Sequence, residues 1–274
     1  MVSTGRAVGD ARPRAGHWAG ATSEGAWRAW NGWDALPAVA LPLKGQRVVV
    51  VSAHPDDEVL ALGGLLQRLG AHGCELVLVC ASAGEASHPD SPTTTPARLA
   101  ARRTEELASA LARLGHAGAE LVHLHLPDSR LGEHSTALAD RLQPHLAGAA
   151  LAVAPWSADG HPDHDVCGRA VRAAARELRL VATAVATTGS PTHDVAVWEY
   201  PVWAWHWAAP ESGALPWGRA RALWLSPGER LAKAEAIGRF LSQVQPLSAH
   251  PADAPPLPAD VIAHFDRPLE VVFT

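Results

Sequence analysis

Short apolar runs that alternate with helical segments are the feature of this sequence that most restricts its fold. Arg47-Val48-Val49-Val50-Val51 is a continuous β-branched run, typical of a strand buried on both faces of a parallel sheet. The predicted strands cover residues 47–51, 76–81, 121–126 and 150–154, and the predicted helices cover residues 58–69, 96–114, 135–146 and 165–178. Strands that alternate with helices in this way are joined by right-handed crossovers. We therefore predict an α/β fold with a doubly wound, mostly parallel sheet and helices on both faces.

The alternation is weaker at both ends of the chain. Residues 1–45 are rich in Gly, Ala, Arg and Trp, and are predicted to form a Trp-containing N-terminal arm that packs on the rest. A chain of 274 residues can bury one substantial core. We therefore expect residues 46–274 to form a single catalytic domain, with residues 46–180 as its core and residues 181–274 as a cap that shapes the substrate pocket. One further helix is predicted over residues 227–244.

Tryptophans are concentrated in the predicted cap, between Trp198 and Trp207. Trp203, Trp205 and Trp207 alternate with other residues, which predicts that all three lie on one face of a strand. Such a row of aromatic side chains suits a buried sheet or a dimer contact. The alternative is a platform on which a sugar ring stacks.

Composition limits the possible partners and the cellular setting. The formal net charge of −5 offers no basic surface for nucleic acid, and no apolar stretch approaches the roughly 20 residues that span a bilayer. The first 20 residues carry several charges and no apolar signal region. Cys74, Cys80 and Cys167 form no CxxC pair, and their odd number argues against a disulfide framework. We expect a soluble, cytoplasmic protein with no membrane span, and a homo-oligomer remains an open alternative.

Two segments place histidine and aspartate directly after predicted strands. The first is Ala53-His54-Pro55-Asp56-Asp57-Glu58, and the second is Gly160-His161-Pro162-Asp163-His164-Asp165. In a parallel sheet both segments lie at the carboxyl edge, where ligands of such folds bind. We therefore expect the two segments to meet around one site.

Two imidazoles and one carboxylate are a ligand set that catalytic zinc uses, with one coordination position left open. His54, Asp57 and His164 are the predicted metal ligands. Ferrous iron accepts the same nitrogen and oxygen ligands, so the residue types do not choose between Zn²⁺ and Fe²⁺.

The remaining polar residues of the two segments match the needs of metal-assisted hydrolysis. Asp56 is the predicted general base, which takes a proton from the attacking water. His161 is predicted to polarise the carbonyl and to stabilise the oxyanion, and Asp163 to hold a histidine in one tautomer.

Less specific interpretations stand beside this one. An Asp-rich turn between a strand and a helix often only caps the helix. A metal-dependent phosphoesterase is disfavoured because such sites usually hold two metals, and the sequence supplies ligands for one. A non-catalytic metal-binding or sugar-binding module is the alternative of a different class, and the presence of Asp56 argues against it.

At these residues the chain resembles the PIG-L/LmbE-like family of zinc-dependent N-deacetylases. The motifs that carry the resemblance are AHPDDE at residues 53–58 and HPDH at residues 161–164, with weaker likeness at residues 102–106, 126–128 and 242–243. The resemblance implies a Rossmann-like fold and hydrolysis of an N-acyl group, most often acetyl, from an amino sugar such as an N-acetylglucosamine conjugate. It implies the same roles for His54, Asp57, His164, Asp56 and His161 as the chemistry does.

The resemblance also extends to residues around the substrate. Asp128 corresponds to a position that lines the pocket in the family, although an ordinary turn at a strand end is the alternative, and we assign Arg102 to substrate binding with it. Some members have a tyrosine two residues before HPDH that assists the oxyanion, whereas this chain has Asp159. Its single tyrosine, Tyr200, would have to reach the site from the C-terminal region. The donor that completes the oxyanion hole is therefore left open.

Overall fold

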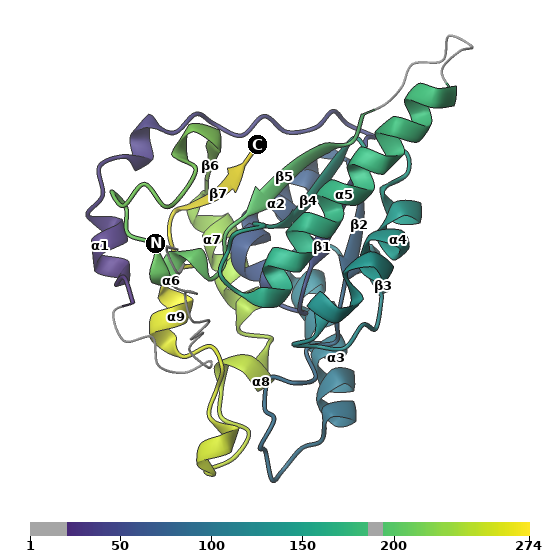
Figure 1. Cartoon of the computed structure of the whole chain (residues 1–274). Helices are drawn as coiled ribbons and strands as arrows, with labels where there is room; N and C mark the ends of the chain where they lie inside the picture. The colour runs from purple at the N-terminus through teal and green to yellow at the C-terminus, as the bar shows by residue number, and fades with distance from the viewer. Residues whose placement is uncertain (1–20, 186–193) are drawn as a thin grey trace, which may run out of the picture.

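A mixed sheet lies at the centre of the computed structural model, which describes residues 21–185 and 194–274 (Figure 1). Within these residues seven strands form one sheet in the order β3-β2-β1-β4-β5-β7-β6. Their bounds are Arg47–Ser52 (β1), Glu75–Cys80 (β2), Glu120–His123 (β3), Leu151–Pro155 (β4), Ala196–Tyr200 (β5), Ala220–Trp224 (β6) and Leu269–Phe273 (β7). The first five strands in chain order run parallel, and β7 runs antiparallel to both of its neighbours. The predicted doubly wound, mostly parallel α/β fold is confirmed.

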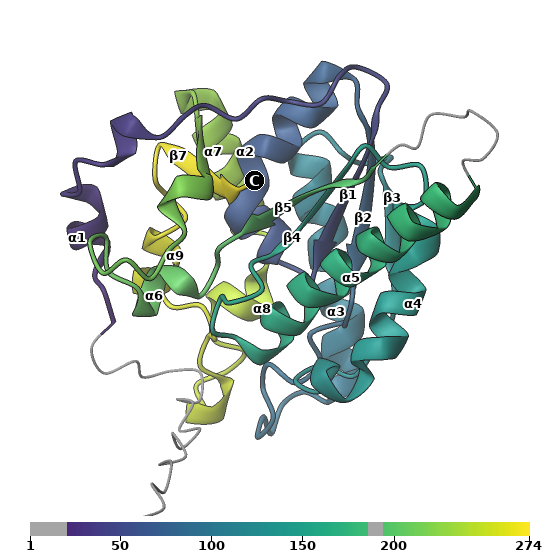
Figure 2. The same cartoon turned by 45° about the horizontal axis from the view of Figure 1, so that its top comes forward.

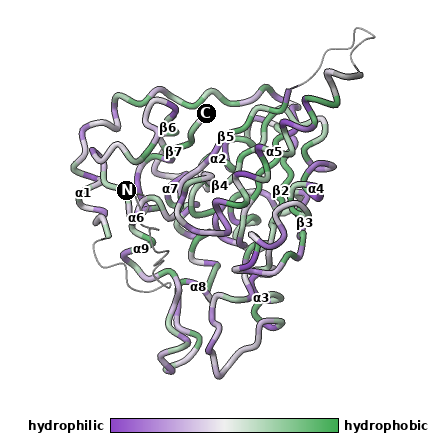
Figure 3. The backbone as a smooth tube through the Cα atoms, viewed as in Figure 1, coloured by the Kyte–Doolittle hydropathy of each residue, from purple (hydrophilic) through white to green (hydrophobic). Residues whose placement is uncertain are grey.

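Helices cover both faces of the sheet (Figure 2). The α-helices of the described residues are Glu24–Arg28 (α1), Asp57–His72 (α2), Pro96–Arg113 (α3), Ser135–Leu146 (α4), Pro162–Val185 (α5), Ala204–Trp207 (α6), Pro227–Ile237 (α7), Leu241–Val244 (α8) and Ala259–Ala263 (α9). Val48 and Val50 of β1 belong to the core that contains α2, α3 and α7, whereas Val49 and Val51 belong to the core that contains α4 and α5. Side chains that alternate along a strand therefore build two cores, and the central strands are mostly hydrophobic (Figure 3).

The C-terminal third departs most from the sequence predictions. The predicted helix over residues 227–244 is two helices, α7 and α8, because the chain turns at Gly238 to bury Phe240. The two antiparallel strands β6 and β7 were not predicted. The predicted third strand over residues 121–126 is shorter, since β3 ends at His123.

The predicted strand with Trp203, Trp205 and Trp207 on one face is wrong. Residues 204–207 form the short helix α6, so Trp205 and Trp207 lie on opposite sides of it. Trp205 is buried in the core, whereas Trp207 is 38% exposed.

The helix that follows β1 is broken in its middle. Leu62 has non-helical dihedral angles, and Gly63 and Gly64 follow it. Glu270 of β7 accepts hydrogen bonds from the amides of Gly64 and Leu65, at 2.7 and 2.8 Å, which the break leaves without helical partners. Lys233 of α7 donates to the same carboxylate at 2.8 Å. The C-terminal elements thus hold the helix that carries Asp57 in place.

The described part of the N-terminal segment packs against the C-terminal elements. Trp27 is fully buried, and its indole N–H donates to the carbonyl of Trp205 at 2.8 Å. The guanidinium of Arg267 lies 5.2 Å from the Trp27 ring and 4.4 Å from the Trp205 ring. Residues 37–39 pair with β6 at the edge of the sheet. Residues 1–20 of the predicted arm lie outside the described residues.

Two expectations from composition can be compared with the described residues. All three cysteines are free, in agreement with the predicted absence of disulfides. Among the described helices none is both long enough and apolar enough to cross a bilayer.

Candidate active site

The two predicted segments meet at the carboxyl edge of the sheet. His54 follows β1, and Asp57 begins α2 three residues later. His164 lies in the first turn of α5, which follows β4. Since β1 and β4 are adjacent and parallel, their ends bring these residues together, and the His54 and His164 rings lie 5.4 Å apart.

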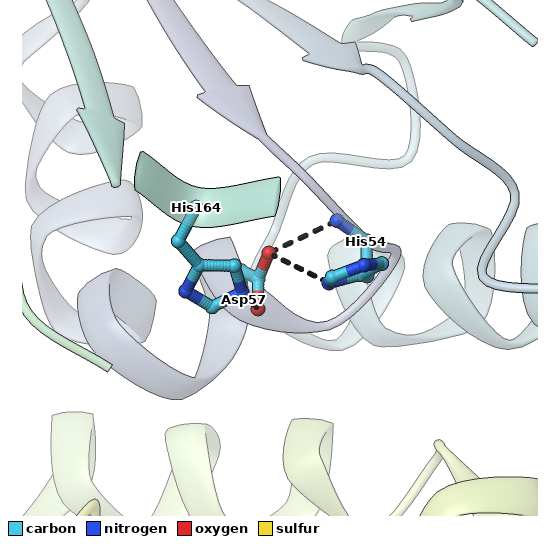
Figure 4. A group of neighbouring side chains, drawn as sticks. All are labelled: His54, Asp57 and His164. Carbon is cyan, nitrogen blue, oxygen red and sulfur yellow. Dashed lines mark hydrogen bonds and ion pairs between the residues drawn. The ribbon is translucent and has the colours of Figure 1, made fainter. Parts of the chain in front are cut away.

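Asp57 lies between the two histidines (Figure 4). Its Oδ2 accepts hydrogen bonds from the amides of Ala53 and His54, at 3.1 and 2.9 Å, and lies 3.7 Å from His54 Nδ1. Its Oδ1 lies 3.2 Å from His164 Nε2. One ligand atom from each of the three residues lies within 4.8 Å of the others. This spacing suits a single cation with bonds of about 2.0 to 2.2 Å to each ligand.

His164 has the tautomer that metal binding requires. Its Nδ1 lies 2.8 Å from Asp159 Oδ2, and a carboxylate can only accept, so the ring proton is on Nδ1. In the neutral ring, the form that binds a metal ion, Nε2 therefore carries the lone pair. Although it lies near Asp57 Oδ1, this buried atom has no hydrogen-bond partner among the described residues. The lone pairs of His164 Nε2 and Asp57 Oδ1 face one point, and a cation at that point would bind both. The residues therefore fit a metal ion.

The electrostatics of the site also favour a cation. Burial lowers the pKa of His164, but the carboxylates of Asp57 and Asp159 outweigh burial and raise it to about 9. Burial likewise lowers the pKa of His54, and Asp128 and Asp163 reverse the effect and hold it well above its ordinary value. Both shifts arise from an excess of buried carboxylates. A metal ion would supply the positive charge that this field stabilises.

Asp56, next to Asp57 in the chain, binds a buried arginine. Arg103 of α3 donates to Asp56 Oδ2 at 2.8 Å and to the carbonyl of Gly84 at 2.9 Å, and both charged side chains are buried. Gly84 has φ of 65°, and a Cβ there would lie 1.9 Å from the guanidinium, so only glycine fits. Burial raises the pKa of Asp56, while the charge of Arg103 limits the rise.

His161 lies beside both histidines of the predicted ligand set. Its ring is 5.0 Å from that of His54 and 4.6 Å from that of His164. The amide of Asp163 donates to His161 Nδ1 at 3.2 Å, so a neutral His161 carries its proton on Nε2 and can donate from there.

Asp163 is fully buried and lies next to His54. Its Oδ2 is 3.4 Å from His54 Nε2 and also accepts from the amide of Ser129, at 2.7 Å. Ser129 has φ of 64°, a left-handed conformation that aims this amide at the carboxylate. His54 is therefore the histidine on which Asp163 would act in its predicted role of holding one tautomer.

The two predicted substrate residues differ in position. Asp128 is buried, and its Oδ1 lies 3.1 Å from His54 Nε2. Arg102 is exposed and donates to Glu106 at 2.9 Å, while its neighbour Arg103 is the residue that reaches Asp56. A substrate contact of Arg102 stays a prediction.

Tyr200 does not supply the missing oxyanion donor. It is fully buried, and its hydroxyl donates to the carbonyl of Val51 at 2.9 Å, behind the site. Trp203, by contrast, lies 6.1 Å from the His161 ring at an angle of 25°. Stacking of a sugar on the tryptophans stays a prediction.

Two residues at the site were not assigned from the sequence. Arg103 was noted only as part of a helix, and Asp159 only as a departure from the family pattern. Nothing local marks either one, because Asp56 lies 47 residues from Arg103 and the partners of Asp159 include residues 202–204. The one signal for assigning these two residues was general, because a charge that is buried needs a partner.

Comparison with known proteins identifies the fold and the family. The fold resembles that of teicoplanin deacetylase Orf2 in its zinc-inhibited form, with a TM-score of 0.54 and 21% identity over 72% of this chain and 85% of that one. The model of the family PIG-L, described as GlcNAc-PI de-N-acetylase, matches residues 49–175. This region contains both histidine segments.

Curated relatives match over a longer region. The 1D-myo-inositol 2-acetamido-2-deoxy-alpha-D-glucopyranoside deacetylase of Streptomyces avermitilis is 31% identical over 227 residues, which are 71% of this chain and 72% of that enzyme. The chain belongs to the PIG-L family. The enzyme with the same description from Corynebacterium glutamicum strain R is 30% identical over 51% of this chain, and the match spans 56% of the length of that relative.

Proposed function

We propose that this protein is a zinc-dependent hydrolase that removes an N-acetyl group from an amino sugar conjugate. The observation that carries the proposal is the convergence of His54, Asp57 and His164 on one point, with a bare nitrogen on His164. Asp56 lies next in the chain to Asp57 and remains outside the ligand set. A cation site with a neighbouring carboxylate base is what amide hydrolysis by one metal requires.

His54, Asp57 and His164 would hold the zinc ion. When bound, the ion supplies Lewis-acid chemistry, which makes water more acidic and polarises the acyl carbonyl. Asp56 accepts the proton of the attacking water as the oxygen adds to the carbonyl carbon. The carbon–nitrogen bond then breaks, Asp56 returns the proton to the departing amine, and the products are acetate and the free amino sugar.

Two further residues prepare this chemistry. Arg103 holds Asp56 Oδ2 in one direction, which keeps the base oriented. His161, with its proton on Nε2, donates a hydrogen bond to the oxygen that becomes negative when water adds. Each such donor in a dry site contributes a factor of about 10² to 10³ in rate.

The substrate class rests on the relatives. The relatives from S. avermitilis and C. glutamicum are described as deacetylases of an acetamido-deoxy-glucopyranoside. We propose a small N-acetylglucosamine conjugate as the substrate. Zinc is the proposed ion, and because two imidazoles and one carboxylate also accept ferrous iron, reconstitution with each metal decides between the two.

Amine release tests the proposal. The protein is stripped of metal, reconstituted separately with Zn²⁺ and with anaerobic Fe²⁺, and incubated with N-acetylglucosamine conjugates while primary amine and acetate are measured. We expect both products in equal amounts from the zinc form. Asp56→Asn should keep its zinc and lose turnover by a factor of about 10² to 10⁴. A zinc-loaded protein that releases no amine from any conjugate would instead indicate the non-catalytic binding module.

A further inference from the structure

Asp159 is a fully buried carboxylate with four donors around it. Its Oδ2 accepts from His164 Nδ1 at 2.8 Å and from the amide of Trp203 at 2.9 Å. Its Oδ1 accepts from the amides of Val202 and Ala204, at 2.8 and 3.0 Å. One side chain thus contacts a predicted metal ligand and the chain segment that leads into α6.

A carboxylate can accept from all four groups. The three backbone amides can only donate, and each oxygen of Asp159 receives at least one of them. An asparagine has one oxygen and one NH₂ group, so either orientation would place N–H against N–H. With the NH₂ group toward His164, Nδ1 could act only as an acceptor. The ring proton would then move to Nε2, the atom that faces Asp57 and the cation position.

Contacts of the neighbouring backbone hold the same segment. The carbonyl of Asp159 accepts from the indole N–H of Trp207 at 2.7 Å. Gly160 follows with φ of 91°, and a Cβ there would lie 2.6 Å from the Trp207 ring. Residues 202–207 are therefore fixed on the turn that carries HPDH, which places Trp203 against His161.

We propose that Asp159 is a positioning residue that couples the metal site to the segment 202–207. Through Oδ2 it fixes the His164 tautomer, and through both oxygens it orders the amides that place Trp203 beside His161. Because one carboxylate makes both sets of contacts, metal binding and the order of this segment stabilise each other to the same extent. This inference rests on the proposed metal centre and assigns a role to a residue outside its ligand set.

Metal affinity is the first test, measured as the zinc dissociation constant by competition with a chelator. Asp159→Asn should bind zinc about 10- to 100-fold more weakly than the natural protein. The matched control is Glu199→Gln. Glu199 is also a fully buried carboxylate that accepts from a backbone amide, that of Ser157 at 3.0 Å, and from arginines, but it touches no predicted ligand. The control should lose stability and keep the zinc dissociation constant.

Hydrogen exchange is the second test, and its first part needs no variant. In the natural protein, zinc should slow exchange of the amides of residues 202–204, and it should do so much less in Asp159→Asn. Unchanged zinc affinity in Asp159→Asn, or exchange at these amides that zinc does not affect in the natural protein, would overturn the role of Asp159. A natural protein that binds no zinc at all would instead refute the proposed metal centre.

Discussion

Replacement of Glu24 by glutamine should weaken the attachment of the N-terminal segment in a pH-dependent way. Glu24 of α1 accepts hydrogen bonds from Arg267, at 2.7 to 3.1 Å, and lies 2.9 Å from His264 Nδ1. Its side chain is 10% exposed. Burial raises the pKa of Glu24, but His264 and Arg267 outweigh burial and lower it from 4.5 to about 2.

The magnitude follows from this change in proton affinity. At about 1.4 kcal/mol for each tenfold change, a pKa of about 2 in place of 4.5 corresponds to about 3 kcal/mol. Solvent screening reduces the figure, so we expect Glu24→Gln to lower the free energy of unfolding by about 2 kcal/mol at pH 7. Because the pKa is lower in the folded state, this contribution is complete above pH 4.5 and is lost as the pH falls toward 2.

Urea denaturation of both proteins at pH 7, 4.5 and 3 measures the effect. The difference between them should be largest at pH 7 and should shrink below pH 4.5. Glu235→Gln is the control, since Glu235 pairs with Arg113 at the surface and should change the free energy of unfolding by less than about 0.5 kcal/mol. A difference of equal size at pH 3 and pH 7 would show that the Glu24 charge is not what holds the segment.

Three further substitutions test the packing and the metal site. Trp27→Ala should lower the free energy of unfolding by about 3 to 5 kcal/mol in urea denaturation, because it removes a fully buried ring that packs against Arg267. Lys233→Met should lower it by about 3 kcal/mol, because it leaves Glu270 buried without its ion pair, and an unchanged stability would show that the Gly64 and Leu65 amides suffice. His164→Ala should reduce the zinc content after reconstitution to well below one ion per chain, measured by elemental analysis, and a full equivalent would remove His164 from the ligand set.

Local patterns in the sequence predicted the parallel part of the fold well. The β-branched run of β1 and the helices α3 and α4 lie at or near their predicted bounds, because each signal is contained in consecutive residues. The C-terminal third was predicted poorly. The alternation of Trp203, Trp205 and Trp207 has the period of a strand, yet the chain there forms α6, and amides at and just before the start of α6 donate to Asp159. Tertiary hydrogen bonds outweighed the local pattern.

By itself the sequence determined which residue types stand at the carboxyl edge of the sheet. A histidine and an aspartate three positions apart after β1, and two histidines three positions apart at the start of α5, need only adjacent parallel strands to meet. Only the tertiary structure decided the partners of those residues, namely Arg103 for Asp56 and Asp159 for His164. The physical reason is that a buried charge must be paired, but many residues of the right type are available along the chain. Packing of helices and loops selects among them.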